Sequence, residues 1–200
     1  MAQTILYHLS LNSPWTYMGH ARFLEIAERH GASVVYKPTN YRIVFPETGG
    51  LPLPQRPPAR RAYRLQELER WSAFNGVPLN KLPAFHPADE RAAVGMVLAA
   101  IERGLDPGPM VIGVLTAQWA EERDIGDADT LLAIAAKRGY ADPAGLLADG
   151  SSDAMTAAWE RHSQDALAAG VFGAPTYVLG EQLFWGQDRL DFLDRALAQT

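Results

Sequence analysis

The sequence contains no cysteine among its 200 residues. This absence excludes disulfide bonds, metal sites built on thiolates and any catalytic thiol that the chain itself would supply. Long apolar runs are also missing, since none approaches the ~20 residues of a membrane-spanning helix. The first residues, MAQTILYHLSLNS, lack a basic segment followed by a long apolar one, so we predict no signal peptide and expect a cytoplasmic protein.

The sequence has fewer basic than acidic residues. It contains 18 Lys and Arg and 23 Asp and Glu, which gives a formal net charge of -5. That balance argues against nucleic acid or an anionic membrane surface as the main partner. A hydrophobic content of 48% is ordinary for a chain that buries a core. The length fits one domain, or one core that carries an insertion.

Short β-forming segments lie near both ends of the chain, and helical patterns follow them. The opening segments predict a β-α-β unit, in which two parallel strands are joined by a right-handed crossover. The closing segments predict a β-hairpin and an amphipathic helix. The predicted elements are a strand at 4–9, a helix at 14–30, a strand at 33–37, strands at 176–179 and 183–185 around a turn at 180–182, and a helix at 188–198. Together the two ends predict one small mixed α/β sheet.

The middle of the chain divides into a proline-rich stretch and a helical block. Residues 38–58 hold several prolines and two adjacent glycines but are too apolar for a disordered linker, so we predict an ordered loop. The predicted helices of the block span 59–75, 88–103, 109–123, 128–139, 143–149 and 153–169. The sequence therefore predicts a core formed by 1–37 and 171–200, with 59–170 as an all-helical insertion.

Ser13 and Pro14 stand where the first strand pattern gives way to a helical one. Serine is a favoured N-cap and proline suits the first helical position, so helix capping alone explains the pair. The same junction leaves backbone N–H groups and the positive end of the helix dipole free to stabilise an anion. Because no base is evident nearby, we interpret Ser13 as a hydrogen-bond donor and not as a nucleophile.

Three further features have both a structural and a functional interpretation. Pro175 precedes a strand and is either an ordinary trans turn proline or a cis one. Asp188 is either the cap of the last helix or the partner of a ligand ammonium. Four arginines form either a solvated helix face or a site that recognises a carboxylate through guanidinium groups. These four are Arg56, Arg60, Arg61 and Arg64.

The order of these features resembles a known family. A strand is followed by SPWTY at a helix start, then a helical insertion, GVFGAPTY and FWGQDRL. This order resembles the 2-hydroxychromene-2-carboxylate isomerases, relatives of kappa-class glutathione transferases in the DsbA-like branch of the thioredoxin fold. The resemblance covers essentially the whole chain. It implies a thioredoxin-like β-α-β…β-β-α core with an inserted all-helical domain, glutathione as cofactor and a homodimer. We expect no metal site.

The resemblance also implies roles for the residues around the helix start. DsbA-like oxidoreductases carry a C-x-x-C pair where this chain has SPWT, so the thiol would have to come from glutathione. Ser13 matches the family serine that hydrogen-bonds the glutathione sulfur. Ala174 precedes the position of the family's cis-proline, Pro175, and its backbone would pair with the glutathione peptide.

Other positions match the family's contacts to the two ends of glutathione. Asp188 matches the acid that holds the γ-glutamyl ammonium, and the backbone N–H of Gln187 lies beside it in sequence. Arg60 stands where many relatives have a lysine that contacts the glycyl carboxylate. Gly50 stands where some relatives have an asparagine.

The resemblance suggests a mechanism in which the glutathione thiolate adds reversibly to an unsaturated aromatic carboxylate. We expect residues 38–58 to lie on the substrate side, and Trp15, Tyr41 and Arg42 to hold the ring and carboxylate of this small-molecule partner. Two other functions remain open. One is a kappa-like glutathione transferase or peroxidase, and the other is a non-catalytic thioredoxin-like binding module.

Overall fold

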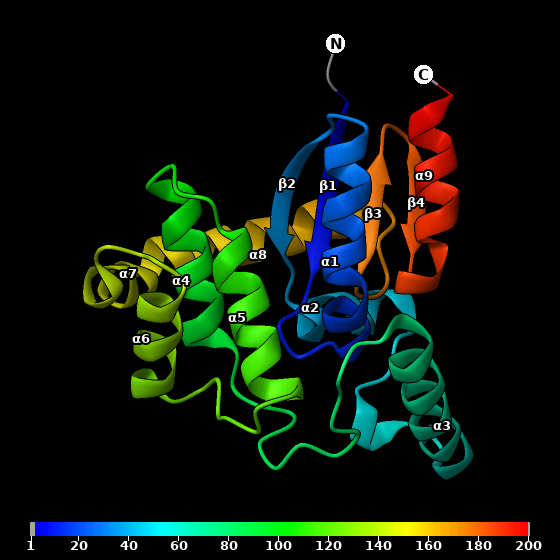
Figure 1. The fold of residues 1–200 in the computed structure, drawn as a ribbon, viewed down its shortest axis with the longest axis horizontal. Coiled ribbons are helices and arrows are strands. Elements are labelled where there is room, and N and C mark those ends of the chain that lie inside the picture. The colour runs from blue at the N-terminus through cyan, green and yellow to red at the C-terminus, as the bar shows by residue number, and fades with distance from the viewer. Residues whose placement is uncertain (1–2, 200) are drawn as a thin grey trace.

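The computed structural model describes residues 3–199, which form a four-stranded mixed sheet with helices around it (Figure 1). The sheet order is β2-β1-β3-β4. Strand β2 runs parallel to β1, while β3 runs antiparallel to both β1 and β4. The strands are β1 (Thr4–Leu9), β2 (Ser33–Pro38), β3 (Thr176–Leu179) and β4 (Gln182–Trp185). The predicted strands are therefore confirmed, except that Pro38 belongs to β2 and not to the loop, and Gln182 belongs to β4 and not to the turn.

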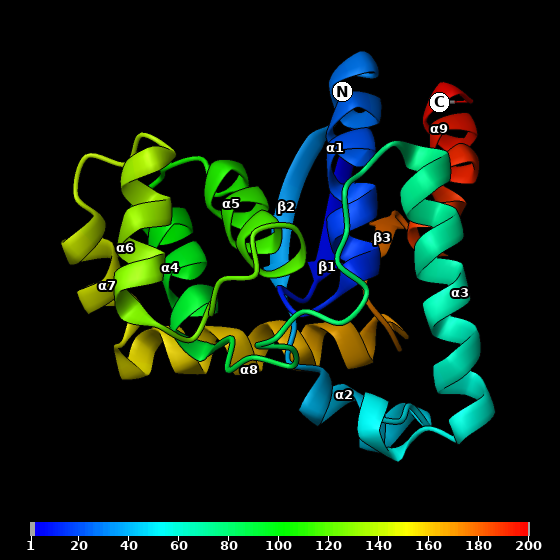
Figure 2. The same ribbon diagram turned by 60° about the horizontal axis from the view of Figure 1, so that its bottom comes forward.

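Helices cover both faces of this sheet. Helix α1 (Pro14–Arg29) and helix α9 (Leu190–Ala198) lie on one face, and α8 (Asp153–Ala168) crosses the opposite face (Figures 1 and 2). The carboxyl end of β1 points to the end of the molecule where α2 (Tyr41–Thr48) and α3 (Pro58–Asn75) lie (Figure 1). This end therefore gathers the start of α1 and the segments that the sequence assigns to the site.

The remaining helices, packed beside the sheet, follow the predicted pattern within a few residues. They are α4 (Arg91–Glu102), α5 (Gly108–Trp119), α6 (Ala128–Lys137) and α7 (Pro143–Gly150). Asp127 and Asp142 cap α6 and α7 by accepting backbone N–H groups, as their positions predict. Within residues 3–199, no helix is both long and apolar enough to span a bilayer.

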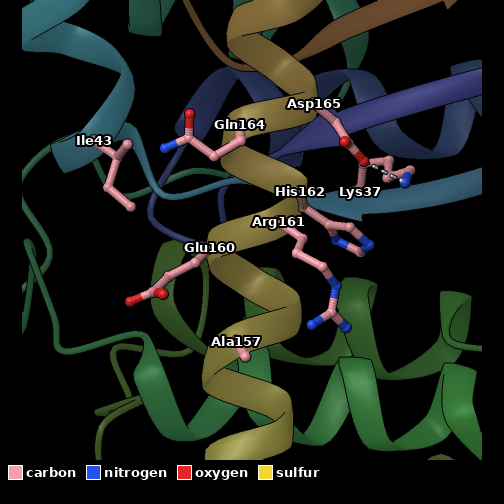
Figure 3. A pocket seen from close by; sticks show the side chains of 8 residues that line it. All are labelled: Lys37, Ile43, Ala157, Glu160, Arg161, His162, Gln164 and Asp165. Atoms are coloured by element: carbon pink, nitrogen blue, oxygen red, sulfur yellow. Dashed lines mark hydrogen bonds and ion pairs between the residues drawn. The ribbon is translucent and has the colours of Figure 1, made fainter.

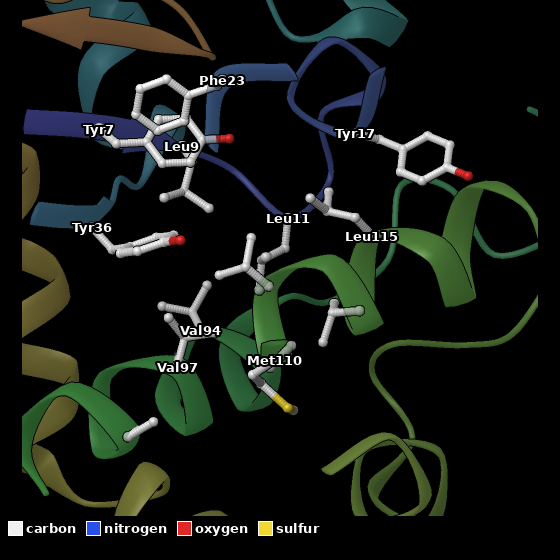
Figure 4. Close-up of a cluster of buried hydrophobic side chains, with 14 of the residues drawn as sticks. Tyr7, Leu9, Leu11, Tyr17, Phe23, Tyr36, Val94, Val97, Met110 and Leu115 are labelled. Atoms are coloured by element: carbon white, nitrogen blue, oxygen red, sulfur yellow. The ribbon is translucent and has the colours of Figure 1, made fainter. Parts of the chain in front are cut away.

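One hydrophobic core runs from the sheet into the helical part (Figure 4). Tyr7 lies at its sheet end, with its ring centroid 4.6 Å from that of Phe23 and 5.3 Å from that of Tyr177. Toward α4 and α5 the same core continues through Leu9, Leu11, Val94, Val97, Met110 and Leu115. This continuous packing fixes the helical part against the end of β1, where α1 begins.

The structure corrects two of the predicted elements. Residues 38–58 are not a loop throughout, because they contain α2 and a 3₁₀ turn, η1 (Leu53–Gln55). Asn40 caps α2 and Gly49 ends it in the left-handed conformation, although Pro46 lies inside the helix. The last helix begins at Leu190, preceded by the 3₁₀ turn η2 (Gln187–Arg189), so Asp188 does not cap α9.

Candidate active site

Ser13 is the N-cap of α1 and also joins this helix to a distant segment. Its backbone is extended, and its Oγ accepts the N–H of Thr16 at 3.2 Å, which confirms the capping interpretation. The same hydroxyl donates to the carbonyl oxygen of Ala174 at 3.3 Å. Ser13 is only 9% exposed. Two motifs that are 161 residues apart in sequence therefore meet at one hydroxyl group.

The turn before β3 is held from several sides. The Ala174–Pro175 peptide bond is cis, which resolves the choice that the sequence left open. The Oγ1 of Thr176 donates to the carbonyl of Gly173 at 2.7 Å, and the hydroxyl of Tyr41 donates to the same carbonyl at 2.9 Å. Because β3, α2 and the Ser13 hydroxyl all contact this turn, the backbone at Ala174 has a fixed orientation beside the start of α1.

The turn η2 lies next to the cis-proline. The N–H of Gly186 donates to the carbonyl of Pro175 at 2.9 Å, so the segment that carries Asp188 is tied to the same turn as Ser13. The Asp188 side chain is 35% exposed and forms an ion pair of 3.2 Å with Arg189. The structure therefore brings Ser13, Pro175 and Asp188 to one end of the sheet, with the Asp188 carboxylate still reachable from solvent.

Gln187 is buried and its side chain has a structural role. Its Oε1 accepts from Nδ2 of Asn75 at 3.0 Å, which attaches η2 to the end of α3. On its other side it packs against Gly19 of α1, where a Cβ atom would lie 2.6 Å from the Cβ of Gln187. The Gln187 side chain therefore holds η2 between the end of α3 and α1.

The arginine cluster lies around the start of α3 and is divided between two environments. Arg60 and Arg61 are exposed, as a solvated helix face predicts, whereas Arg56 and Arg64 are partly buried. Burial, followed by the neighbouring Arg56, lowers the pKa of Arg64 to about 10. Burial and Arg60 likewise lower the pKa of Arg56. The cluster therefore divides into two solvated guanidinium groups and two partly buried ones.

Gly50 has no room for the asparagine found in some relatives. A Cβ atom at this position would collide with the ring of Phe45. Gly50 also donates its N–H to the carbonyl of Phe45 at 3.0 Å, which closes the end of α2. A side chain at position 50 would thus require Phe45 to move.

The three residues predicted to contact substrate lie in different surroundings. Trp15 is half-buried and packs against the main core. Tyr41 is 8% exposed, and its hydroxyl is committed to the Gly173 carbonyl. Arg42 is exposed, and its charge helps to lower the pKa of Asp89, after the larger effect of Arg91. Tyr41 therefore supports the cis-proline turn, and Trp15 and Arg42 keep partly free surfaces.

A family model for the DSBA-like thioredoxin domain matches residues 4–198. The chain belongs to the DSBA-like thioredoxin family. The expected thioredoxin-like fold and the expected family resemblance are both confirmed. Its helix start reads SPWT, and the whole sequence lacks cysteine.

Named relatives of this DSBA-like protein are isomerases. A 2-hydroxychromene-2-carboxylate isomerase from Sphingobium xenophagum is 29% identical, with 98% of this chain and 99% of that protein covered. One from Pseudomonas putida is 26% identical, with 96% and 93% covered. A solved isomerase of the same name aligns with a TM-score of 0.83 at 25% identity, covering 98% of this chain and 95% of that one. These relatives support an isomerase function.

A disulfide reductase shares the fold at greater distance. The cytosolic disulfide reductase DsbM from Pseudomonas aeruginosa, solved with GSH, aligns with a TM-score of 0.71 at 21% identity. The alignment covers 98% of this chain and 99% of that one. At this identity the likeness shows the fold alone.

A polar network lies beside Ser13 that no local sequence pattern indicates. The Glu90 carboxylate accepts from Oγ of Ser10 at 3.0 Å and from the N–H of Asn12 at 3.0 Å. Asn12 in turn exchanges hydrogen bonds with the backbone of Ala88 and accepts from Gln118. Burial raises the pKa of Glu90, although the bonds from Ser10 and Asn12 oppose this shift. The network fixes the turn that leads into the Ser13 N-cap.

A cavity of about 550 Å³ lies elsewhere, along α8 (Figure 3). It contains an ion pair of 3.0 Å between Lys37 and Asp165. Its lining residues are Lys37, Ile43, Ala157, Glu160, Arg161, His162, Gln164 and Asp165. Ile43 lies in the 38–58 segment expected on the substrate side, but none of the lining residues is among the individually predicted site residues. In the part of the chain that the structure describes, no three His, Asp or Glu side chains are grouped to hold a metal ion.

Proposed function

We propose that this protein is a glutathione-dependent isomerase. It would interconvert 2-hydroxychromene-2-carboxylate and trans-o-hydroxybenzylidenepyruvate, or a related pair of aromatic carboxylates. The observation that carries this proposal is the contact between Ser13, at the start of α1, and the carbonyl before the cis-proline, in a chain without cysteine. The isomerases named above support the reaction class.

The residues at this end of the sheet fit glutathione in charge and in hydrogen bonding. The start of α1 offers a positive dipole end to a thiolate. The backbone at Ala174 is fixed beside it by the Ser13 hydroxyl. The partly exposed Asp188 carboxylate can pair with an ammonium group. The DsbM structure solved with GSH shows that a protein of this fold can hold this tripeptide.

When bound, glutathione would supply a thiolate that adds reversibly to the conjugated side chain of the substrate, so that a double bond becomes single and rotates. A free thiol has a pKa of ~8.5 and is mostly protonated at neutral pH. The Ser13 hydroxyl and the N–H groups of the first turn would lower this pKa, as helix starts do for other thiols. One pKa unit corresponds to ~1.4 kcal/mol, which is within reach of a single hydrogen bond to a charged group.

The Ser13 hydroxyl has one proton, so it cannot donate to the glutathione sulfur and to another acceptor at the same time. A hydroxyl donates only one hydrogen bond, and here it donates to the Ala174 carbonyl. To donate to sulfur, Ser13 must release that carbonyl, which then needs another donor. The peptide N–H of glutathione would supply it, so binding would exchange one donor for another and leave no carbonyl unpaired.

The substrate partner in this proposal is a small aromatic carboxylate, and the active form is a homodimer. A kappa-like transferase or peroxidase would share the same glutathione site and differ in the acceptor. Assays separate the two functions, because an isomerase returns glutathione unconsumed, while a transferase consumes it. A binding module without activity would take up glutathione or another peptide without turnover.

Turnover with and without glutathione tests the proposal, together with Ser13→Ala. We expect isomerisation only with glutathione, and we expect the variant to bind glutathione with a thiol pKa raised by about one unit. Asp127→Ala is the matched control, because it removes the N-cap of α6 but lies outside the site. Turnover that ignores glutathione would refute the proposal, as would an unchanged thiol pKa and rate in Ser13→Ala.

A further inference from the structure

Arg64 is partly buried and packs over an aromatic side chain, unlike the exposed arginines of α3. Its guanidinium carbon is 5.9 Å from the ring centroid of Trp119, at the end of α5. The His86 ring packs against the same indole, with 4.6 Å between the ring centroids. Trp119 itself is fully buried. Arg64 is therefore oriented by packing from α5 and from the segment before α4, which limits the conformations of its side chain.

Among residues 3–199, the positive charge of Arg64 has no acidic partner within ion-pair distance. Most ion pairs in residues 3–199 neutralise arginines, but none of them includes Arg64, Arg56 or Arg60. Arg56 is also partly buried, and its Nε donates to the carbonyl of Leu51 at 2.8 Å. Two half-buried guanidinium groups of like charge destabilise each other. An anion between them would relieve that repulsion and accept bidentate hydrogen bonds.

Arg64 is also connected to the start of α1. The low pKa of His86, about 4, comes from burial and then from the charge of Arg64, and a hydrogen bond to the backbone of Asn12 opposes it. Asn12 immediately precedes Ser13, and Glu90 holds its N–H. A chain of direct contacts thus runs from Arg64 through Trp119 and His86 to the residue before the N-cap.

We propose that Arg64, with Arg56 beside it, binds the carboxylate of the aromatic substrate, and that Trp119 and His86 orient its guanidinium group. This assignment rests on the proposed function for the identity of the substrate. It assigns different arginines to the two carboxylates that the cluster could bind, that of glutathione and that of the substrate. The exposed Arg60 remains for the glycyl carboxylate of glutathione, and the inward-facing Arg64 takes the carboxylate of the acceptor. Because the pKa of His86 is lowered to about 4, first by burial, its ring adds no charge beside Trp119 at neutral pH.

Binding measurements test this assignment without turnover. Salicylate, an aryl carboxylate with an ortho hydroxyl, is the probe, and its affinity is followed through tryptophan fluorescence, with Trp119→Phe to assign the signal. Glutathione affinity is measured separately by calorimetry. In Arg64→Gln we expect the salicylate Kd to rise about 10- to 100-fold, as the loss of a charge-assisted hydrogen bond predicts, with no change for glutathione. Arg61→Gln, an exposed arginine on the same helix, is the matched control and should change neither.

Three results would overturn the assignment. Unchanged salicylate affinity in Arg64→Gln would remove the site, and a selective loss of glutathione affinity would assign Arg64 to the glycyl carboxylate. An equal loss in Arg61→Gln would show only a long-range effect of charge.

Arg64→Lys keeps the positive charge and so controls for misfolding of Arg64→Gln. We expect Arg64→Lys to bind salicylate more tightly than Arg64→Gln does. As a second readout, saturating salicylate should raise the pKa of His86 in the unmodified protein, because the bound anion offsets the Arg64 charge. These outcomes are independent of whether turnover needs glutathione, so failure of the assignment and failure of the proposed function are distinguishable.

Discussion

Gly19→Ala tests whether the packing of α1 against η2 controls glutathione binding from a distance. A Cβ atom at Gly19 would lie 2.6 Å from the Cβ of Gln187 and 3.3 Å from its Cα. The nearer contact is too short, and the obstacle is the root of a buried side chain and not its flexible end. Gln187 is also held by Asn75, so the overlap is relieved mainly by moving η2 away from α1. That movement displaces Asp188, the next residue.

The size of the effect follows from two opposing contributions. Overpacking a core by one methyl group typically costs about 1–3 kcal/mol. Alanine is favoured over glycine inside a helix by about 1 kcal/mol, which offsets part of this cost. We therefore expect a net loss of stability of up to about 2 kcal/mol and a Tm lower by up to about 8 °C. Because a charge-assisted hydrogen bond is sensitive to small displacements, we expect the glutathione Kd to rise by about tenfold.

Thermal unfolding and calorimetric titration with glutathione measure the two effects. Gly113→Ala is the matched control, since its Cβ would lie 2.6 Å from Cγ2 of Ile134, between α5 and α6. This variant should lose comparable stability and keep its glutathione affinity. The reasoning fails if Gly19→Ala binds glutathione as tightly as the unmodified protein does, or if Gly113→Ala weakens binding equally.

Three other predictions concern charge. Asp188→Asn should weaken glutathione binding about tenfold and leave Tm nearly unchanged, because the Arg189 pair that it loses is solvated. Burial lowers the pKa of His8 and His20 to about 4, so their contribution to stability is present above the unfolded pKa of ~6.5 and is lost as the pH falls toward 4. Urea unfolding should show a loss of about 2 kcal/mol per histidine at pH 5 relative to pH 7.5, and a flat profile would contradict the burial argument. Glu90→Gln removes a carboxylate next to the start of α1, so the thiol pKa of bound glutathione should fall; a rise would show that Glu90 acts only through the geometry of its network.

The elements that the sequence predicted well are those set by local chemistry. Ser13 and Pro14 define the start of α1, and Asp127 defines the start of α6, because a cap acts on N–H groups two or three residues away. Helix α2 was missed although Asn40 and Gly49 provide both of its end signals. The several prolines and adjacent glycines of 38–58 predicted a loop, yet Pro46, the proline inside this short helix, removes only one backbone bond.

The parts that the sequence did not reveal depend on contacts between distant segments. Glu90 meets Asn12 across 78 residues, and nothing in either local pattern selects that pairing. The same holds for Arg64, which, unlike the exposed Arg61, is partly buried and packs over the Trp119 ring. A periodic arginine pattern shows that one face of α3 is basic, but the burial of individual guanidinium groups depends on how α3 packs.

Ser13 shows why capping and ligand binding are compatible functions of one residue. A helix start needs an acceptor for its free N–H groups, and the Ser13 Oγ is such an acceptor. The hydroxyl proton is then free to donate, and in the described structure it donates to the carbonyl oxygen of Ala174, the residue before Pro175. A cysteine at this position would offer the junction a thiolate covalently fixed to the chain. A serine leaves the positive helix end without a negative charge, and an external thiolate would therefore find both a favourable potential and a donor at the same point.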